Sequence, residues 1–270
     1  MRDSPRPIDA ADVARHLRTA ALGRTLHLHE ELASTNDEAL RLARAGAPHG
    51  EAVIAERQAQ GRGRLGRSWA SPPRRNLYLS VVLRPGLPPA RAPEIPLTAA
   101  VAVADALRDV GVDAGIKWPN DLHVDGRKIA GLLGEASFDP RRLLFVVLGL
   151  GVNLNAAPYD LPEEVRALAA TAREILGRPV ERAPFAAGVL NHLETWLGRL
   201  ETEGFAPVAA AWRERSVTLG RRVRVTEFDR VLEGDAVDID DTGALLLRTE
   251  AGVERILSGD VTSLRPVEAR

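Results

Sequence analysis

The sequence ERQAQGRGRLGRSWASPPRRNLYL occupies residues 56–79 and lies between two runs of strand-forming residues. The apolar run Ala52–Ala55 before it is typical of a buried strand, and the period-two alternation over Leu77–Leu83 predicts a half-buried strand. Glycines in the intervening loop allow backbone angles that other residues avoid, so main-chain N–H groups can turn toward an anion that arginines surround. The pattern therefore predicts a loop that binds a phosphate or a carboxylate, formed by Gly61, Gly63, Gly66, Arg62, Arg64 and Arg67.

Two other interpretations of this loop are weaker. An RGG-like segment that contacts RNA non-specifically normally lies in a disordered, low-complexity region, whereas this loop is flanked by strands. A Walker loop requires the pattern GxxxxGK[ST], which the chain does not contain. The GxGxxG-like spacing leads into Trp69 and Pro72–Pro73 instead of a helix, which argues against a dinucleotide-binding fold.

Length and composition are typical of a soluble globular protein with one large domain, or with one large and one small domain. The chain has 270 residues and a formal net charge of −1, so any attraction to anions or nucleic acid must be local. No apolar run approaches the roughly 20 residues that span a bilayer, and the N-terminal region lacks a secretory apolar core. We therefore expect a cytoplasmic protein. The absence of cysteine excludes disulfides, thiolate metal sites and a cysteine nucleophile.

The distribution of basic residues is uneven. Among the 36 lysines and arginines, only Lys117 and Lys128 are lysines, and they lie close together in the sequence. A chain that otherwise uses arginine, yet has lysine at these two positions, indicates a need for a compact ammonium group that a planar guanidinium cannot replace. Chance placement could explain one of these lysines, but it is a weaker explanation for the two together.

The second expected helix begins at a polar segment. Ser34 is predicted to cap this helix, Asp37 completes a capping box, and Gly46 ends the helix. Thr35 and Asn36 have no role in that capping pattern. At a helix N-terminus their polar groups are candidates to bind a neutral polar group of a ligand.

The segment Lys117–Trp118–Pro119–Asn120–Asp121 predicts the rim of a site. A strand breaks at Pro119, and polar residues gather at the break, where loops commonly display functional groups. A plain Asx turn would explain Asn120 and Asp121 but not the lysine and the tryptophan.

A hairpin is predicted at Asp125–Gly126, the strongest turn signal in the chain. In the strand that follows, Lys128 shares a face with small and apolar side chains. Its side chain therefore lies either at the solvent-exposed end of the strand or in a pocket. The next strand, Leu143–Leu154, ends in the glycine- and asparagine-rich run Gly149–Asn155, which again indicates a strand that meets a cavity.

The remaining chain divides into helices followed by short strands. Helices are predicted over Ile8–Leu22, Pro93–Val110, Pro162–Leu176, Pro184–Glu203 and Phe205–Arg215. From Ser216 onward, closely spaced strands are typical of a small β-barrel of SH3 size; they are Arg221–Val225, Val231–Ile239, Ala244–Leu247, Val253–Leu257 and Val261–Leu264. The predicted domains are therefore residues 1–215 and 216–270.

Taken together, these segments resemble the biotin protein ligases, which attach biotin to a lysine of the biotin carboxyl carrier protein. The resemblance covers residues 34 to about 265 in the family order, and the combination of GRGRxGRxW, KWPND and KxAG is highly specific. The matching pieces are Ser34–Thr35–Asn36, the run from Glu56 to Trp69, Asn76–Leu77–Tyr78, Lys117 to Asp121, Gly126 to Glu135, Gly149 to Asn155, and Leu176 to Val180.

The resemblance implies a fold and a set of site residues. The fold is α+β: a catalytic domain with a mixed sheet, similar to class II synthetases, and a C-terminal SH3-like module. The biotin-contacting positions are Ser34, Thr35, Asn36, Gln58, Gly61, Arg62, Gly63, Arg64, Lys128 and Gly131. The positions around the adenylate are Arg64, Trp69, Lys117, Asn120, Asp121 and Asn153, and Arg265 matches a position that approaches ATP. The catalytic candidates are Lys128, Arg64 and Lys117.

The reaction that the resemblance implies uses ATP and biotin as substrates, with Mg²⁺ accompanying ATP and no protein metal ligand named. Biotinyl-adenylate forms first, and a lysine of the carrier protein then attacks it. A homodimer is a possible assembly, since many relatives dimerise. Only 33 residues precede Ser34, too few for the winged DNA-binding domain of repressor members, so we expect a ligase that does not bind DNA or a membrane.

Two departures from the family pattern concern the shape of loops, namely Arg75, where many relatives have glycine, and Gly134, where a branched apolar residue is usual. Two alternative functions remain open at this point. A lipoate–protein ligase would have a related fold and mechanism with a different acyl chain. A non-catalytic biotin sensor would belong to another class, and the presence of both lysines argues against it. The related octanoyl transferases are excluded because they use a cysteine.

Overall fold

A seven-stranded mixed sheet forms the centre of the main domain in the computed structural model, which describes residues 6–139, 142–227 and 230–263. The strand order is β1-β2-β3-β7-β6-β5-β4, in which β1 and β2 are parallel and the other neighbours antiparallel. The strands are β1 (Leu26–His29), β2 (Ala52–Ala55), β3 (Leu77–Leu83), β4 (Gly115–Lys117), β5 (Asp121–Val124), β6 (Arg127–Phe138) and β7 (Leu143–Val152).

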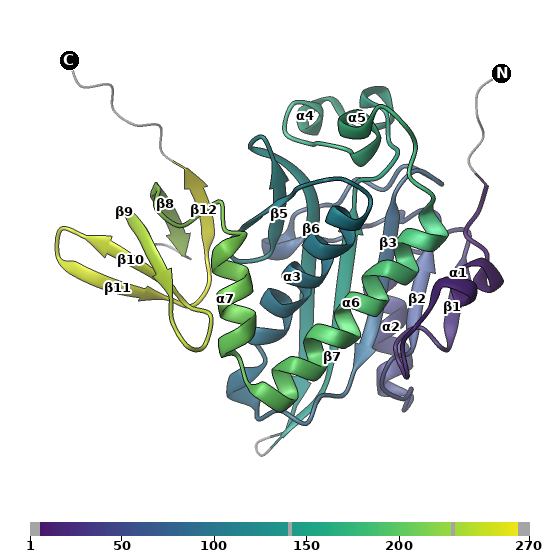
Figure 1. Cartoon of the computed structure of the whole chain (residues 1–270), viewed down its shortest axis with the longest axis horizontal. Coiled ribbons are helices and arrows are strands. Elements are labelled where there is room, and N and C mark those ends of the chain that lie inside the picture. The colour runs from purple at the N-terminus through teal and green to yellow at the C-terminus, as the bar shows by residue number, and fades with distance from the viewer. Residues whose placement is uncertain (1–5, 140–141, 228–229, 264–270) are drawn as a thin grey trace.

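Helices cover one face of this sheet, with α3 and α6 side by side across it (Figure 1). Their buried aliphatic side chains form one core with the inward residues of the strands. Helix α7 packs against α3 and α6, and α1 packs against α6. The helices are α1 (Ala10–His16), α2 (Thr35–Arg44), α3 (Glu94–Asp109), α4 (Glu163–Arg166), α5 (Ala172–Leu176), α6 (Arg182–Glu203) and α7 (Ala206–Glu214).

The opposite face of the sheet is covered by α2. Ala39 and Ala43 of this helix form a second apolar cluster with Val53, Val82 and Val147, whose neighbours in sequence belong to the main core. Strand β3 is consequently buried along its whole length. The sequence predicted a half-buried strand here, and that prediction was wrong because side chains on both faces of β3 are covered.

The hairpin predicted at Asp125–Gly126 joins β5 to β6. Both residues have positive φ, 50° and 77°, as the favoured two-residue hairpin turn requires. The unusual Gly134 on β6 also has a packing reason, since a Cβ at this position would lie 3.1 Å from Cγ of Pro96. Arg75 pairs with Asp160 at 3.3 Å and so ties the segment before β3 to the chain after β7.

Two predicted helices are shorter than expected. The first ends at His16, because the backbone N–H groups of residues 20–22 donate to the carboxylate of Glu194 on α6 instead of continuing a helix. The helix predicted over 162–176 is split into α4 and α5. Between them, the chain pairs with the start of β6: Lys128 N donates to Leu168 O at 2.7 Å, and Ala170 N donates to Lys128 O at 2.9 Å.

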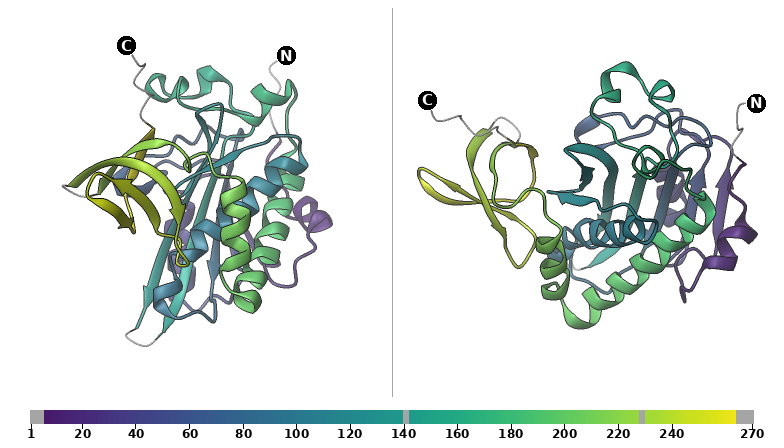
Figure 2. Two further views of the ribbon diagram at one scale, coloured as in Figure 1. Left: turned by 60° about the vertical axis from the view of Figure 1, so that its left-hand side comes forward. Right: turned by 45° about the horizontal axis from the view of Figure 1, so that its top comes forward.

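A five-stranded antiparallel sheet follows α7, with the order β11-β10-β9-β8-β12, and lies to one side of the main domain (Figure 2). Within the described residues its two edge strands do not pair, so the sheet is open rather than a closed barrel. Its strands are β8 (Arg222–Glu227), β9 (Arg230–Ile239), β10 (Leu245–Thr249), β11 (Gly252–Ile256) and β12 (Asp260–Ser263). The predicted α+β fold with a mixed sheet and a small C-terminal β-module is confirmed.

Side-chain contacts hold the two sheets together. The indole N–H of Trp118, a fully buried residue, donates to Gly243 O at 3.1 Å in the β9–β10 turn. The backbone N–H of Trp118 donates to Thr218 at 2.9 Å. The KWPND segment therefore anchors the C-terminal module. Among the described helices, none is long and apolar enough to cross a membrane.

Candidate active site

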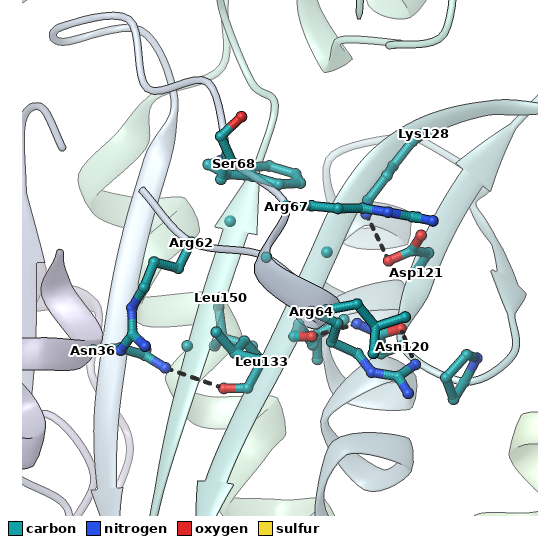
Figure 3. Close-up of a pocket in the computed structure, with 18 of the residues that line it drawn as sticks. Asn36, Arg62, Arg64, Arg67, Ser68, Asn120, Asp121, Lys128, Leu133 and Leu150 are labelled. Atoms are coloured by element: carbon teal, nitrogen blue, oxygen red, sulfur yellow. Dashed lines mark hydrogen bonds and ion pairs between the residues drawn. The ribbon is translucent and has the colours of Figure 1, made fainter. Parts of the chain in front are cut away.

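A cavity lies on the α2 face of the main sheet, between the glycine-rich loop and the ends of β4 to β7 (Figure 3). Side chains from segments far apart in the sequence converge on it. The predicted site residues that line it are Ser34, Thr35, Asn36, Gln58, Arg62, Gly63, Arg64, Trp69, Lys117, Asn120, Asp121, Lys128 and Gly131.

One end of the cavity is a set of neutral polar groups that hold each other in place. The carbonyl oxygen of Gln58 accepts from the backbone N–H of Thr35 at 2.9 Å and from its hydroxyl at 3.0 Å. The hydroxyl of Ser80 contacts Thr35 Oγ1 at 2.8 Å and donates to Asn36 Oδ1 at 2.6 Å. Because Ser34, Thr35, Asn36 and Ser80 are all buried, these groups are preorganised for a ligand that is itself polar and uncharged at this end.

The predicted capping of α2 is only partly correct. Ser34 occupies the N-cap position with an extended backbone, but its side chain makes no capping hydrogen bond. Asp37 does not complete a capping box either, because its carboxylate pairs with Arg62 at 2.6 Å. Arg62 also lies 3.0 Å from Glu135, so two carboxylates compensate its charge.

The floor of the cavity consists of three glycines, Gly131, Gly149 and Gly151. A Cβ at Gly149 would lie 2.1 Å from Asn36 Oδ1, and one at Gly151 would lie 2.5 Å from the Trp69 ring. A Cβ at Gly131 would lie 2.9 Å from both Lys128 and Trp69. Side chains therefore approach the backbone of β6 and β7 closely here, which any larger residue would prevent.

Four basic side chains line the other end of the cavity: Arg67, which pairs with Asp260, and Lys128, Arg64 and Lys117. Lys128 Nζ pairs with Asp121 at 2.7 Å and lies 5.3 Å from the centre of the Trp69 ring. Arg64 donates to Asn120 Oδ1 at 3.2 Å, and burial lowers the pKa of its guanidinium. Figure 3 shows Lys128 turned toward Asp121 and Arg64 turned toward Asn120.

Lys117 differs from the other three basic groups. Among the described residues, none forms an ion pair or hydrogen bond with its ammonium group, although Asp121 and Asp260 lie near enough to influence it. Burial lowers the pKa of Lys117. A half-buried ammonium group without a direct partner is available for an incoming anion.

The glycine-rich loop is closed on itself by backbone hydrogen bonds. Gly63 N donates to Arg67 O at 2.7 Å, Arg67 N to Arg64 O at 3.1 Å, and Trp69 N to Gly61 O at 2.8 Å. These three N–H groups are used within the loop and are not free for a ligand. That other loop amides bind an anion stays a prediction, and the arginine side chains are further candidate anion-binding groups.

Only one of the three loop glycines needs glycine's conformational freedom. Gly66 has a φ of 73°, whereas Gly63 has an extended backbone. Gly61 does not line the cavity, but a Cβ there would lie 2.5 Å from Trp69 O. The role of Gly61 in this structure is therefore to let the two ends of the loop close.

A second cavity adjoins the first and shares with it Arg67, Ser68, Trp69 and Lys128. Its remaining walls are mostly apolar and come from the chain between β7 and α5: Leu161, Val165, Leu168 and Ala169. Asn153 lines this cavity and not the first one. The predicted adenylate position Arg265 lies outside the described residues.

The C-terminal module contributes a residue that the sequence did not indicate. Asp260 lines the first cavity, and its carboxylate receives two hydrogen bonds from Arg67, at 3.2 and 2.6 Å. These hydrogen bonds lower the pKa of Asp260. No local pattern marks this aspartate, because its partner lies 193 residues earlier in the chain. Ser80 was also missed, although a serine inside an otherwise apolar strand is a usable signal.

Metal ligands were not predicted, and the described part of the chain contains no group of three or more histidine, aspartate or glutamate side chains placed to hold a metal ion. The carboxylates that line the first cavity, among described residues, are Asp121 and Asp260. Each is hydrogen-bonded or paired with a basic side chain of the site.

Comparison with known families places this architecture in a class. The Biotin/lipoate A/B protein ligase family matches residues 29–153, and the Biotin protein ligase C terminal domain matches residues 218–262. Fold and site thus define a protein ligase catalytic domain of the biotin/lipoate type with an attached C-terminal module.

Individual relatives narrow this class. The chain is 37% identical to the biotin--[acetyl-CoA-carboxylase] ligase of Paracoccus denitrificans, covering 84% of this chain and 96% of that protein. It is 36% identical to the ligase of the same name from Mycobacterium tuberculosis, covering 96% and 97%. The structure of biotin protein ligase from Aquifex aeolicus in complex with biotin and ATP matches with a TM-score of 0.77 and 30% identity, over 90% of this chain and 99% of that one. The chain belongs to the biotin protein ligase family, and the family prediction is confirmed.

Proposed function

We propose that the protein activates biotin with ATP to form biotinyl-5′-adenylate, and then transfers biotin to a lysine of a biotin carboxyl carrier protein. The observation that carries the proposal is the order of groups along the site. A neutral polar end leads over the glycine floor to four basic groups, and then to a second, apolar cavity beside Trp69. This order suits an uncharged ring system, a reacting carboxylate beside a phosphate, and a nucleotide base.

In this assignment the polar end formed by Thr35, Asn36 and Gln58 binds the ureido ring of biotin, which has both hydrogen-bond donors and acceptors. The aliphatic tail crosses the floor at Gly131, where a side chain would block it. The apolar cavity lined by Leu161, Val165 and Leu168 receives the adenine, with Asn153 as its polar group.

The first step joins two anions, and their repulsion is the main obstacle. A carboxylate oxygen of biotin attacks the α-phosphorus of ATP, and the bond to the leaving pyrophosphate breaks. Lys128 and Arg64 neutralise charge at the point where carboxylate and phosphate meet, and Lys117 provides a further positive charge. In a site shielded from water such fixed charges act more strongly on the transition state than they would in solution. Mg²⁺ would enter with ATP, held largely by phosphates and water.

The second step requires no nucleophile from the enzyme. The ε-amine of the carrier lysine attacks the acyl carbon of the mixed anhydride, AMP leaves, and the amine loses a proton. The site's contribution is approach and orientation, which can supply much of the rate enhancement. The names of the relatives from Paracoccus denitrificans and Mycobacterium tuberculosis support acetyl-CoA carboxylase as the source of the carrier. A homodimer remains a proposal drawn from the family.

The test is ATP–pyrophosphate exchange with purified protein, with biotin, lipoate or octanoate added separately. We expect exchange with biotin alone, followed by labelling of a carrier domain when it is added. Exchange with lipoate instead would make the protein a lipoate–protein ligase, an activity that the matched biotin/lipoate family also covers. Biotin binding without exchange would identify a non-catalytic sensor.

A further inference from the structure

The side chain of Asn76, which immediately precedes β3, is fully buried and contacts the chain that directly follows β7. Its Oδ1 atom accepts from three successive backbone N–H groups, those of Leu154 at 3.0 Å, Asn155 at 3.3 Å and Ala156 at 3.2 Å. Three donors can converge only on the oxygen of an amide, so the Nδ2 group must point the other way. The orientation of the Asn76 amide is therefore fixed by its neighbours.

The orientation of the Asn76 amide in turn fixes the orientation of the side-chain amide of Asn153. Asn76 Nδ2 donates to Asn153 Oδ1 at 3.3 Å, which leaves Asn153 Nδ2 to donate to the carbonyl oxygen of Lys128, also at 3.3 Å. The same carbonyl accepts from Ala170 N at 2.9 Å. Asn76 itself lines neither cavity among the described residues, whereas Asn153 lines the second cavity and Lys128 lines both.

We propose that Asn76 is a positioning residue for adenylation, acting through Asn153 on Lys128; this inference rests on the proposed function. If residue 76 carried only acceptors, the side-chain amide of Asn153 would form a better hydrogen bond after a flip by 180°, because its Nδ2 group could then donate to residue 76. Its Oδ1 would then face the carbonyl oxygen of Lys128, and two acceptors repel each other. The backbone from which Lys128 reaches the reacting groups would shift, and small displacements of reacting groups are costly in rate.

The direct test is Asn76→Asp, which preserves the shape of the side chain and the acceptor for the three N–H groups but removes the donor. We expect kcat for biotin-dependent ATP–pyrophosphate exchange to fall about tenfold or more. The KM for biotin should stay unchanged, because Thr35, Asn36 and Gln58 do not take part in this chain of hydrogen bonds. The matched comparison is the same substitution in an Asn153→Ala background, where the fall should be absent.

Exchange by the wild-type protein tests the proposed function by itself, so its failure is separate from that of this inference. Equal falls in both backgrounds would show that Asn76 only braces the turn at residues 154–156, and would overturn the inference. A rise in the KM for biotin with unchanged kcat would overturn it as well. Should the buried carboxylate prevent folding, Asn76→Ser is used, which removes both the donor to Asn153 and the acceptor for the three N–H groups. Loss of the acceptor affects both backgrounds alike, so the fall in kcat should be larger with Asn153 present than in Asn153→Ala, and equal falls would overturn the inference.

Discussion

The ammonium group of Lys128 lies 2.7 Å from Asp121 and 5.3 Å from the centre of the Trp69 ring, at the boundary between the two cavities. In the proposed reaction, this compact positive charge of Lys128 is the one that meets the carboxylate of biotin and the α-phosphate of ATP. A guanidinium has the same charge but a planar fork geometry that cannot occupy the same point between two oxygens.

We expect Lys128→Arg to lower the rate of ATP–pyrophosphate exchange by roughly a hundredfold or more, the usual cost of removing one preorganised transition-state contact. The matched control is Arg127→Lys at the neighbouring position, whose ion pair with Glu174 lies outside the cavity lining. Exchange by the control should match that of the wild type. Wild-type exchange in Lys128→Arg would contradict the assigned role.

Lys117 provides a prediction about pH. An ordinary lysine has a pKa of about 10.4, and burial lowers the pKa of Lys117, so its positive charge is lost at a lower pH than that of an exposed lysine. The KM for ATP should therefore rise on the alkaline side before ordinary lysines titrate. Lys117→Arg retains a charge through this range and should shift that rise to higher pH. Identical alkaline profiles for the two proteins would rule out Lys117 as the titrating group.

Several parts of the site could be predicted because neighbouring residues in the sequence define them. The loop around GRGRLGRSW, the KWPND break and the turn at Asp125–Gly126 each carry a local signal. The structure brings the first two to one cavity and forms the turn with the expected positive φ at both residues. The predicted capping box was wrong because Asp37 pairs with Arg62, 25 residues away. Propensity describes local hydrogen bonds and does not anticipate a competing partner from another segment.

The missed features depend on contacts between distant segments. Asp260 reaches the site through Arg67, and the helix predicted over 162–176 is interrupted by pairing with Lys128. Burial of β3 on both faces depends on where α2 packs, which the alternation within β3 cannot show. Topology and side-chain contacts across the sheet determine these features, so the periodicity of the sequence alone could not predict them.

The glycine floor provides a test of the biotin assignment. In Gly149→Ala, the new Cβ would lie 2.1 Å from Asn36 Oδ1, so Asn36 must move away from Ser80 and the polar end of the cavity is disrupted. We expect biotin binding, measured by calorimetry, to weaken about 5- to 150-fold, because a buried polar contact of about 1–3 kcal/mol is lost. Gly188→Ala in α6, where a Cβ meets nothing within 4 Å, serves as the control and should bind biotin normally. Normal binding by Gly149→Ala would place biotin elsewhere.

A buried ion pair between Glu56, which directly follows β2, and Arg182, the first residue of α6, provides a test of stability. Arg182 lies 2.6 Å from Glu56, and both side chains are almost completely buried. Arg182 also donates to the carbonyl oxygen of Arg6 at 2.6 Å, and Glu56 accepts from the backbone N–H of Ile8 at 2.5 Å. Arg182→Met preserves most of the side-chain volume but leaves the carboxylate of Glu56 buried without its partner. The free energy of unfolding should fall by about 3–5 kcal/mol, as is usual when one member of a buried pair is removed.

The comparison for this pair is Arg57→Met, which removes an exposed ion pair with Glu31, 3.0 Å long, in the same part of the chain. Because water screens this pair, its loss should change the free energy of unfolding by less than about 1 kcal/mol. Both free energies of unfolding are measured by urea denaturation. The m-value, which is the slope of the free energy against urea concentration, is compared between the variants, because a change in it would indicate an altered unfolded state. Equally small losses in both variants would contradict this prediction, and would show that the buried pair is not what fixes the N-terminal segment at residues 6–8 against Glu56 and Arg182.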